Sequence, residues 1–203
     1  MATKLETEIK LRVDNLLNLI RQLRRIGARD HGRAFEQNTL YDTPRRDFHR
    51  HDRLIRLRVE IAKDGRRKAK LTSKARPDRA ESDSKSKKSA RLHKAKLERE
   101  ADVRDPASTA RLLEKVGLHP SFRYEKYRTS FRLGSLHLDV DETPIGTFLE
   151  LEGPPAAIDR AARKLGYPPA EYIRGTYWDL YAADCRRRRQ KSTDMIFSPK
   201  NGR

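Results

Sequence analysis

The sequence contains little cysteine, few aromatic residues and no long apolar run, and each shortage excludes a class of protein. Cys185 is the single cysteine among 203 residues, so an intrachain disulfide is excluded and a reducing cytoplasm is the expected location. No apolar stretch approaches the roughly 20 residues that cross a bilayer, so we expect no membrane span. The first ten residues, MATKLETEIK, lack the apolar segment of a signal peptide.

Positive charge is abundant, which indicates an anionic partner. The 47 Lys and Arg residues exceed the 29 Asp and Glu residues, which gives a net charge of +18. Such a surplus favours a phosphate compound, nucleic acid or an acidic membrane as partner. The length fits one domain. We expect this domain to cover residues 1–184, with a mobile basic loop over 75–91 and a disordered basic tail over 185–203.

Apolar and charged residues alternate in many segments, and a period of two residues predicts strands. Strands are predicted at Leu5–Val13, Phe35–Tyr41, Leu54–Ile61, Lys68–Lys74, Leu97–Glu100, Arg123–Arg132, Leu136–Asp141 and Leu149–Glu152. Helices are predicted to follow three of them, beginning at Asp14, Asp105-Pro106 and Gly153-Pro154-Pro155 and ending at Gly27, Gly117 and Gly166. This order of elements indicates an α+β fold of about eight strands.

The charges on these strands are sorted into pairs of like sign at positions i and i+2. Residues two apart on a strand share one face and lie about 6.5–7 Å apart. The acidic pairs are Glu6/Glu8, Glu98/Glu100, Asp139/Asp141 and Glu150/Glu152, and the basic pairs are Arg56/Arg58, Lys94/Lys96 and Lys126/Arg128. One such pair is most often a solvated face. This many pairs, each opposite an apolar face, indicate a binding surface instead.

Paired carboxylates need compensating charge, because like charges this close repel each other. Basic strands could supply it, and so could Mg²⁺ or Mn²⁺, which prefer carboxylate oxygen. Rows of Arg and Lys suit phosphate oxygens. If the sheet closes with its charged face inward, each interior charge must be paired, because an unpaired buried charge costs several kcal/mol. Helices would then pack over its apolar outer face.

The order of these motifs resembles the CYTH domain family, also called triphosphate tunnel metalloenzymes. Glu6-Thr7-Glu8-Ile9-Lys10 is similar to the family's ExExK signature. The motifs that follow are Arg56-x-Arg58, Leu71-Thr72-x-Lys74, Lys94-x-Lys96-x-Glu98-x-Glu100, Lys126-x-Arg128, Asp139-x-Asp141, Glu150-x-Glu152 and Thr176-Tyr177. The resemblance covers about Leu5 to Tyr181. The sequence departs from the family pattern at Lys96, where many members have Arg, and at Gly175-Thr176.

The resemblance implies a fold, a site and a cofactor. The fold is an eight-stranded antiparallel closed β-barrel, a tunnel, with helices packed outside. The implied ligands of Mg²⁺ or Mn²⁺ are Glu6, Glu8, Asp139, Asp141, Glu150 and Glu152. The implied triphosphate contacts are Lys10, Arg56, Arg58, Lys74, Lys94, Lys96, Lys126 and Arg128. Lys10, Glu98 and Glu100 are the residues expected to take part in catalysis.

Three functions follow as hypotheses. The family includes class IV adenylate cyclases, thiamine triphosphatases and inorganic triphosphatases. We favour a phosphohydrolase acting on inorganic, nucleoside or thiamine triphosphate, because no nucleobase pocket is readable and Trp178 is expected in the core. The alternatives are a class IV adenylate cyclase, which makes cyclic AMP and pyrophosphate from ATP, and a module that binds polyphosphate or nucleic acid through its basic tail. The expected partner is a small triphosphate, and a homodimer is the assembly considered.

Overall fold

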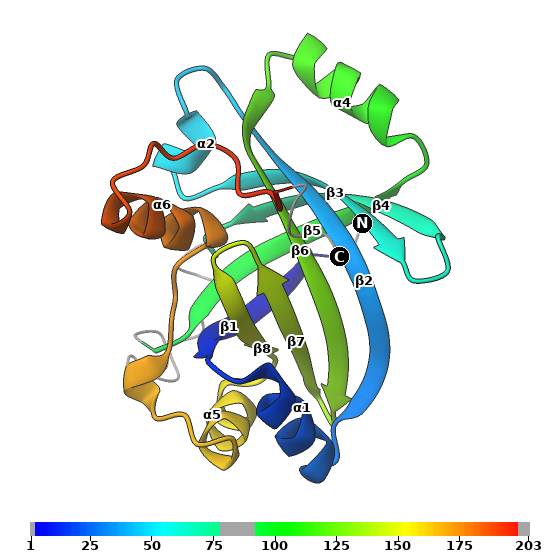
Figure 1. The fold of residues 1–203 in the computed structure, drawn as a ribbon. Coiled ribbons are helices and arrows are strands. Elements are labelled where there is room, and N and C mark those ends of the chain that lie inside the picture. The colour runs from blue at the N-terminus through cyan, green and yellow to red at the C-terminus, as the bar shows by residue number, and fades with distance from the viewer. Residues whose placement is uncertain (1–2, 78–91, 199–203) are drawn as a thin grey trace.

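The computed structural model describes residues 3–77 and 92–198, and its centre is a closed barrel of antiparallel strands (Figure 1). The strands are β1 (Thr3–Val13), β2 (Arg29–Asp42), β3 (Leu54–Ala62), β4 (Arg67–Ala75), β5 (Lys94–Val103), β6 (His119–Leu133), β7 (Leu136–Thr143) and β8 (Gly146–Glu152). Their order around the barrel is β1-β5-β4-β3-β2-β6-β7-β8, and β8 pairs back onto β1. The closed eight-stranded antiparallel barrel implied by the resemblance is confirmed. In the described part of the chain, no helix has both the length and the apolar character needed to cross a membrane.

The helices lie outside the barrel. They are α1 (Leu16–Arg25), α2 (Asp47–Arg50), α4 (Pro106–Lys115), α5 (Pro155–Lys164), the 3-10 helix η1 (Pro169–Glu171) and α6 (Tyr177–Arg187). The predicted start of the first helix at Asp14 is wrong by one residue. The N-cap of α1 is Asn15, whose side-chain oxygen accepts a hydrogen bond from the backbone N–H of Asn18 at 2.9 Å. Either residue type can cap a helix, so composition alone did not decide between them.

The main apolar core lies between the outer face of the barrel and two helices. Leu11, Leu138 and Leu149 project outward from β1, β7 and β8 and are fully buried against Leu23 of α1 and Ile158 of α5. Figure 1 shows these two helices beside each other below the strands. Full burial of such a side chain stabilises the fold by roughly 1.5–3 kcal/mol. The outer face therefore supplies apolar packing and leaves the interior free for charge.

Helix α4 differs from the expectation that every helix covers the sheet. None of its residues is buried, and Leu112 and Val116 are 63% and 66% exposed. Its N-terminus still follows the predicted pattern, because Asp105 accepts a hydrogen bond from the backbone N–H of Ser108 at 3.0 Å. In Figure 1 this helix stands on the opposite side of the barrel from α1 and α5.

The C-terminal segment differs from the disordered tail expected over residues 185–203. The N–H of Met195 donates to the carbonyl of Arg123, and the N–H of Glu125 donates to the carbonyl of Met195, each at 2.9 Å. The Phe197 ring packs 5.4 Å from the Tyr127 ring, measured between centroids. Because β7 pairs with β6 only from residue 127 onward, the first half of β6 has a free edge that residues 193–197 cover. Residues 199–203, and residues 78–91 of the predicted loop, lie outside the described part.

Truncation of Met195 to alanine should lower the free energy of unfolding by about 2–4 kcal/mol, as expected for a large core side chain. Met195 is 1% exposed and packs with the aromatic residues of β6 and α6. Urea unfolding followed by circular dichroism measures the loss. The matched control is Ile196→Ala, because Ile196 is 50% exposed. Equal stability of the two variants would contradict the docking of this segment.

Candidate active site

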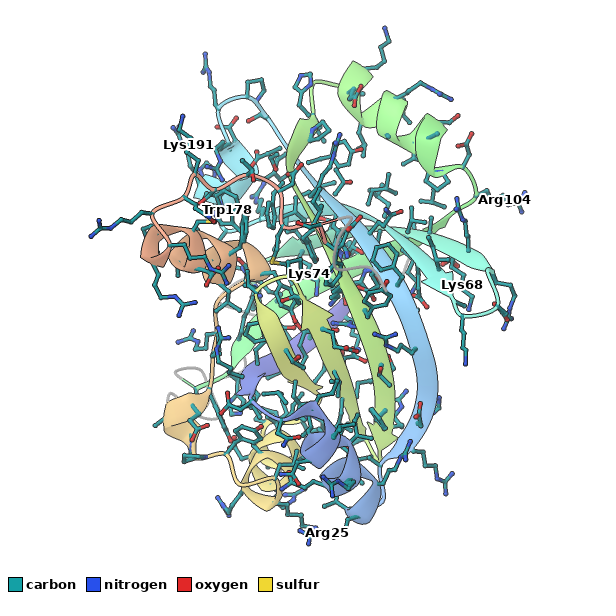
Figure 2. All side chains as sticks on the ribbon, in the orientation of Figure 1. Arg25, Lys68, Lys74, Arg104, Trp178 and Lys191 are labelled. Atoms are coloured by element: carbon teal, nitrogen blue, oxygen red, sulfur yellow. The ribbon has the colours of Figure 1, made fainter. Side chains whose placement is uncertain are left out.

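The lumen of the barrel is a cavity of about 1100 Å³ to which all eight strands contribute side chains. Because side chains alternate between the two faces of a strand, the charged residues point inward and the apolar residues outward. Most of the predicted site residues line it: Glu6, Glu8, Lys10, Arg56, Arg58, Lys74, Lys94, Glu98, Glu100, Lys126, Arg128, Asp139, Glu150 and Glu152. Lys96 and Asp141 are absent from this lining. In Figure 2, Lys74 lies centrally, between Trp178 near α6 and Lys68 on the β3–β4 hairpin.

Lys10 stands between two carboxylates of the lumen. Its Nζ lies 3.2 Å from Glu8 Oε1 and 3.1 Å from Glu150 Oε1, and it is only 3% exposed. Burial alone would lower the pKa of Lys10, but Glu150 and Glu8 raise it. Lys94 also reaches Glu8, at 2.9 Å, and the two lysines hold the pKa of Glu8 well below its usual value in spite of burial. Opposite charges in direct contact therefore compensate one another in this part of the lumen.

Glu6 has a different electrostatic environment from Glu8. Burial raises the pKa of Glu6, and the opposing effect of Lys74 does not cancel the rise. Lys74 forms an ion pair with Glu6 and a second one with Glu98, where Nζ lies 3.1 Å from Oε1. The two carboxylates of the first motif thus differ in their affinity for a proton although they lie on the same face of β1.

Asp141 is a buried anchor for basic side chains. It is 0% exposed, and it accepts hydrogen bonds from Lys126 Nζ at 2.7 Å, from Arg128 Nε at 2.7 Å and from the Tyr177 hydroxyl at 2.6 Å. Arg128 also reaches Asp139 at 2.8 Å. These donors engage both oxygens of Asp141, which does not line the cavity. Asp139, two residues earlier, does face the cavity.

Lys96 is also directed away from the lumen. Its Nζ binds the backbone oxygen of Asp52 at 2.9 Å and the carboxylate of the same residue at 2.5 Å. The structure therefore brings the other predicted basic residues together at the cavity and leaves Lys96 beside the turn before β3.

Glu36 is a lumen residue that belongs to none of the motifs predicted from the sequence. It is 1% exposed, and its carboxylate lies 3.1 Å from Arg58, 3.4 Å from Lys126 and 3.7 Å from Arg128. Burial alone would raise the pKa of Glu36, but Arg58, Lys126 and Arg128 hold it well below its usual value. Its i+2 neighbour is Asn38, so the sequence shows no acidic pair there. The feature of the sequence that could have identified Glu36 is its position on the same face of a strand as other polar residues.

Aromatic side chains gather where α6 packs on the barrel. The Tyr177 ring lies between Lys10 and Lys126, whose Nζ atoms are 5.4 Å and 5.0 Å from its centroid. Trp178 packs edge-on against Phe122 at a centroid distance of 4.9 Å. The Arg46 guanidinium lies 5.1 Å from the centroid of the Trp178 ring. Trp178 is partly buried against this aromatic cluster and also lines the cavity, so the expectation that it lies in the core is met only in part.

The carboxylates offer a donor set that suits a hard divalent cation. Across β1–β8, Glu8 faces Glu152, and across β7–β8, Asp139 faces Glu150. Side chains at such positions have Cβ atoms about 4.5–5.5 Å apart, and Mg²⁺ and Mn²⁺ prefer carboxylate oxygen. Within residues 3–77 and 92–198 no group of three His, Cys, Asp or Glu side chains converges as a metal site. The reason is that these carboxylates are turned toward Lys and Arg, which a cation would have to replace.

Comparison with known proteins decides the family. A sequence model of the CYTH domain matches residues 4–177. The chain belongs to the CYTH family. A sequence comparison with curated proteins finds no match.

Solved structures show the same fold as this CYTH protein. A candidate adenylate cyclase from Vibrio parahaemolyticus aligns with a TM-score of 0.72 and 17% identity, over 88% of this chain and 98% of that one. The PH1819 protein of Pyrococcus horikoshii gives 0.70 and 21%, over 88% and 99%. A candidate adenylyl cyclase from Hippeastrum, described as having a dominant triphosphatase activity, gives 0.55 and 18%, over 92% and 97%. At these identities the likeness establishes the fold alone.

Proposed function

We propose that this CYTH protein is a divalent-metal-dependent phosphohydrolase that acts on a triphosphate. The observation that carries the proposal is the lumen, where cationic and anionic side chains from all eight strands surround one cavity of about 1100 Å³. Members of the CYTH family generally act on triphosphates. A cavity lined in this way suits a polyanion that is held by Lys and Arg and by a cation on the carboxylates.

The basic residues of the lumen are proposed to bind the phosphate oxygens. They are Lys10, Arg56, Arg58, Lys74, Lys94, Lys126 and Arg128. Donors already oriented in a cavity shielded from water stabilise the charge that develops when the phosphoryl group is transferred. Glu98 and Glu100 lie 4.0 Å and 3.9 Å from Arg56, so they are placed to orient a water molecule beside a phosphate bound there. Asp141 and Lys96 support neighbouring residues in this scheme.

The carboxylates proposed to hold the cation are Glu6, Glu8, Asp139, Glu150 and Glu152. A divalent cation bound there supplies charge neutralisation on the phosphate oxygens and lowers the pKa of a bound water. Release of carboxylates from Lys10, Lys74 and Lys94 would free these lysines for phosphate. Cation and substrate binding are therefore expected to be mutually favourable.

Hydrolysis is favoured over cyclisation. A cyclase must hold a nucleobase, and although Trp178 lines the cavity, Phe122 packs edge-on against its ring and the Arg46 guanidinium lies over it. The Hippeastrum structure, described as having a dominant triphosphatase activity, has the same fold. The alternative, a class IV adenylate cyclase, is kept because the Vibrio parahaemolyticus structure is named a candidate adenylate cyclase.

Turnover assays test the proposal directly. The purified protein is incubated with tripolyphosphate, ATP or thiamine triphosphate, in Mg²⁺ or in Mn²⁺, and free phosphate, pyrophosphate and cyclic AMP are measured. We expect phosphate release from at least one substrate, and a chelator should abolish it. Cyclic AMP and pyrophosphate formed from ATP would overturn the hydrolase proposal in favour of the cyclase. Turnover of none of the three would overturn both.

A further inference from the structure

Arg56 differs from Arg58 and Arg128, which also line the lumen, in lacking a close acceptor. Arg128 is saturated by Asp141 and Asp139, with distances of 2.7 and 2.8 Å. The contacts of Arg56 with described residues are long: 3.5 Å to the Tyr124 hydroxyl, 3.4 Å to Thr72 Oγ1, and 4.0 Å and 3.9 Å to the carboxylates of Glu98 and Glu100. Its Nε is buried without a hydrogen-bond partner. A buried donor left without an acceptor is unfavourable, and an arriving oxyanion would remove that cost.

A second unpaired donor lies on the neighbouring strand. Asn38 is 2% exposed, and its side-chain oxygen accepts a hydrogen bond from Arg58 Nε at 2.9 Å. Its Nδ2 is buried with no partner. Asn38 faces Arg58 across β2–β3 and Tyr124 across β2–β6, so these three inward-facing residues form one row across adjacent strands. Arg56 is two residues before Arg58 on the same face of β3.

The cavity becomes apolar next to Arg56. Leu40 faces Arg56 across β2–β3, and Leu54 precedes it by two residues on the same face. Both leucines line the cavity together with Tyr124 and Trp178. Lys74 faces Leu54 across β3–β4, but it forms ion pairs with Glu6 and Glu98. A strongly hydrated chain of phosphates does not continue readily over apolar side chains. A phosphoryl group held by Arg56 is therefore at the end of the chain, and the remaining phosphates lie toward the basic residues of the central lumen.

We propose that Arg56, Tyr124 and Asn38 form a subsite for the end phosphoryl group of the substrate, on the α6 side of the lumen. A guanidinium, a phenolic hydroxyl and an amide N–H₂ are hydrogen-bond donors suited to a tetrahedral oxyanion. Tyr124 donates its hydroxyl hydrogen to a phosphate oxygen. The Nδ2 of Asn38, which lies just behind the cavity wall, supplies the third donor after a small side-chain shift. The identity of the substrate rests on the proposed function. The inference adds Tyr124 and Asn38 to the residues that contact this substrate.

The first test removes one hydroxyl group. Tyr124→Phe keeps the ring that packs on Phe122 and Tyr177 at centroid distances of 5.6 and 5.8 Å. The control is Tyr127→Phe, because Tyr127 lies on the outer face of the same strand and packs on Phe35 at 5.0 Å. Titration calorimetry with sodium tripolyphosphate should show about a tenfold loss of affinity for Tyr124→Phe, the size expected for a hydrogen bond to a charged group. The affinity of Tyr127→Phe should equal that of the wild type.

The second test reverses one donor. Asn38→Asp keeps the size of the side chain and the oxygen that accepts from Arg58, but it replaces the N–H₂ with a carboxylate that repels phosphate. We expect the affinity for sodium tripolyphosphate to fall more than it does for Tyr124→Phe. Thermal unfolding without ligand checks that both variants are folded.

The outcomes separate this inference from the proposed function. Wild-type affinity in both folded variants would overturn the subsite whatever the turnover of the wild type. Weakened binding by both variants, in a protein that binds tripolyphosphate but hydrolyses nothing, would support the subsite and overturn the hydrolase. If one variant is unfolded, the other decides: wild-type affinity in the folded variant would overturn the subsite, and weakened affinity would support it.

Discussion

Replacement of Glu8 by glutamine should lower kcat for phosphate release at least about a hundredfold, the cost typical of removing one preorganised electrostatic group. Glu8 faces Glu152 across β1–β8 and forms ion pairs with Lys10 and Lys94 at 3.2 Å and 2.9 Å. An amide has nearly the same shape but carries no charge, so it is a poorer ligand for a divalent cation. It also leaves two buried lysines with less compensation, which shifts their affinity for phosphate.

Initial rates of phosphate release, measured across a range of Mg²⁺ or Mn²⁺ concentrations, separate these two effects. Loss of a cation ligand raises the metal concentration needed for half-maximal rate, whereas altered lysines change the dependence on substrate. Glu142→Gln is the matched control, because Glu142 lies on the outer face of β7 and pairs with Arg33 at 2.9 Å. Full activity of Glu8→Gln would refute a metal-ligand role for Glu8.

The strands and their charged faces were predictable because the alternation is unusually complete, whereas closure into a barrel was implied by the family resemblance. On β1, Glu6, Glu8 and Lys10 face the lumen, whereas Ile9 and Leu11 are fully buried on the outer face. A one-residue shift in the pairing of such a strand would move its charges into the apolar core, so the pattern specifies both face and register. The predicted charges were therefore placed on the correct surface before any strand order was known.

The roles of individual side chains were less predictable, because they depend on neighbours from distant strands. Asp139 and Asp141 belong to one motif, yet only Asp141 is covered by Tyr177 of α6. Lys96 shares its face of β5 with Glu98, but it turns to Asp52. These differences come from register and from helix docking, and neither is written in the local spacing of a motif.

The structure of the C-terminal segment also depends on residues that are distant in the sequence. Four consecutive arginines after Cys185 predict a solvated tail by composition. Two later apolar residues, Met195 and Phe197, are sufficient to attach the segment to the free edge of β6. Whether an apolar residue in a polar stretch finds a partner depends on an exposed edge elsewhere in the fold, which the sequence of the segment itself does not describe.

Replacement of Asp141 by alanine should lower the free energy of unfolding by about 3–5 kcal/mol, because removing one partner of a buried ion pair leaves its charge uncompensated. Lys126 is 1% exposed and lies 2.7 Å from Asp141, and its other carboxylate, Glu36, is 3.4 Å away. Arg128 keeps further contacts with Asp139 and Glu150, so Lys126 is the side chain that loses most of its compensating charge.

The comparison that tests this reasoning is Asp139→Ala, two residues earlier on the same face of β7. Asp139 lines the cavity and is solvated from the lumen, and Arg128 retains Asp141 and Glu150 when it is removed. We expect a loss of about 1 kcal/mol for this variant, in the range of a partly exposed ion pair. Urea unfolding of both variants measures the difference. Equal losses would contradict the assignment of Asp141 as the anchor of the basic cluster. A larger loss for Asp141→Ala would show that the two aspartates of one motif differ, with Asp141 contributing more to the stability of the barrel than Asp139.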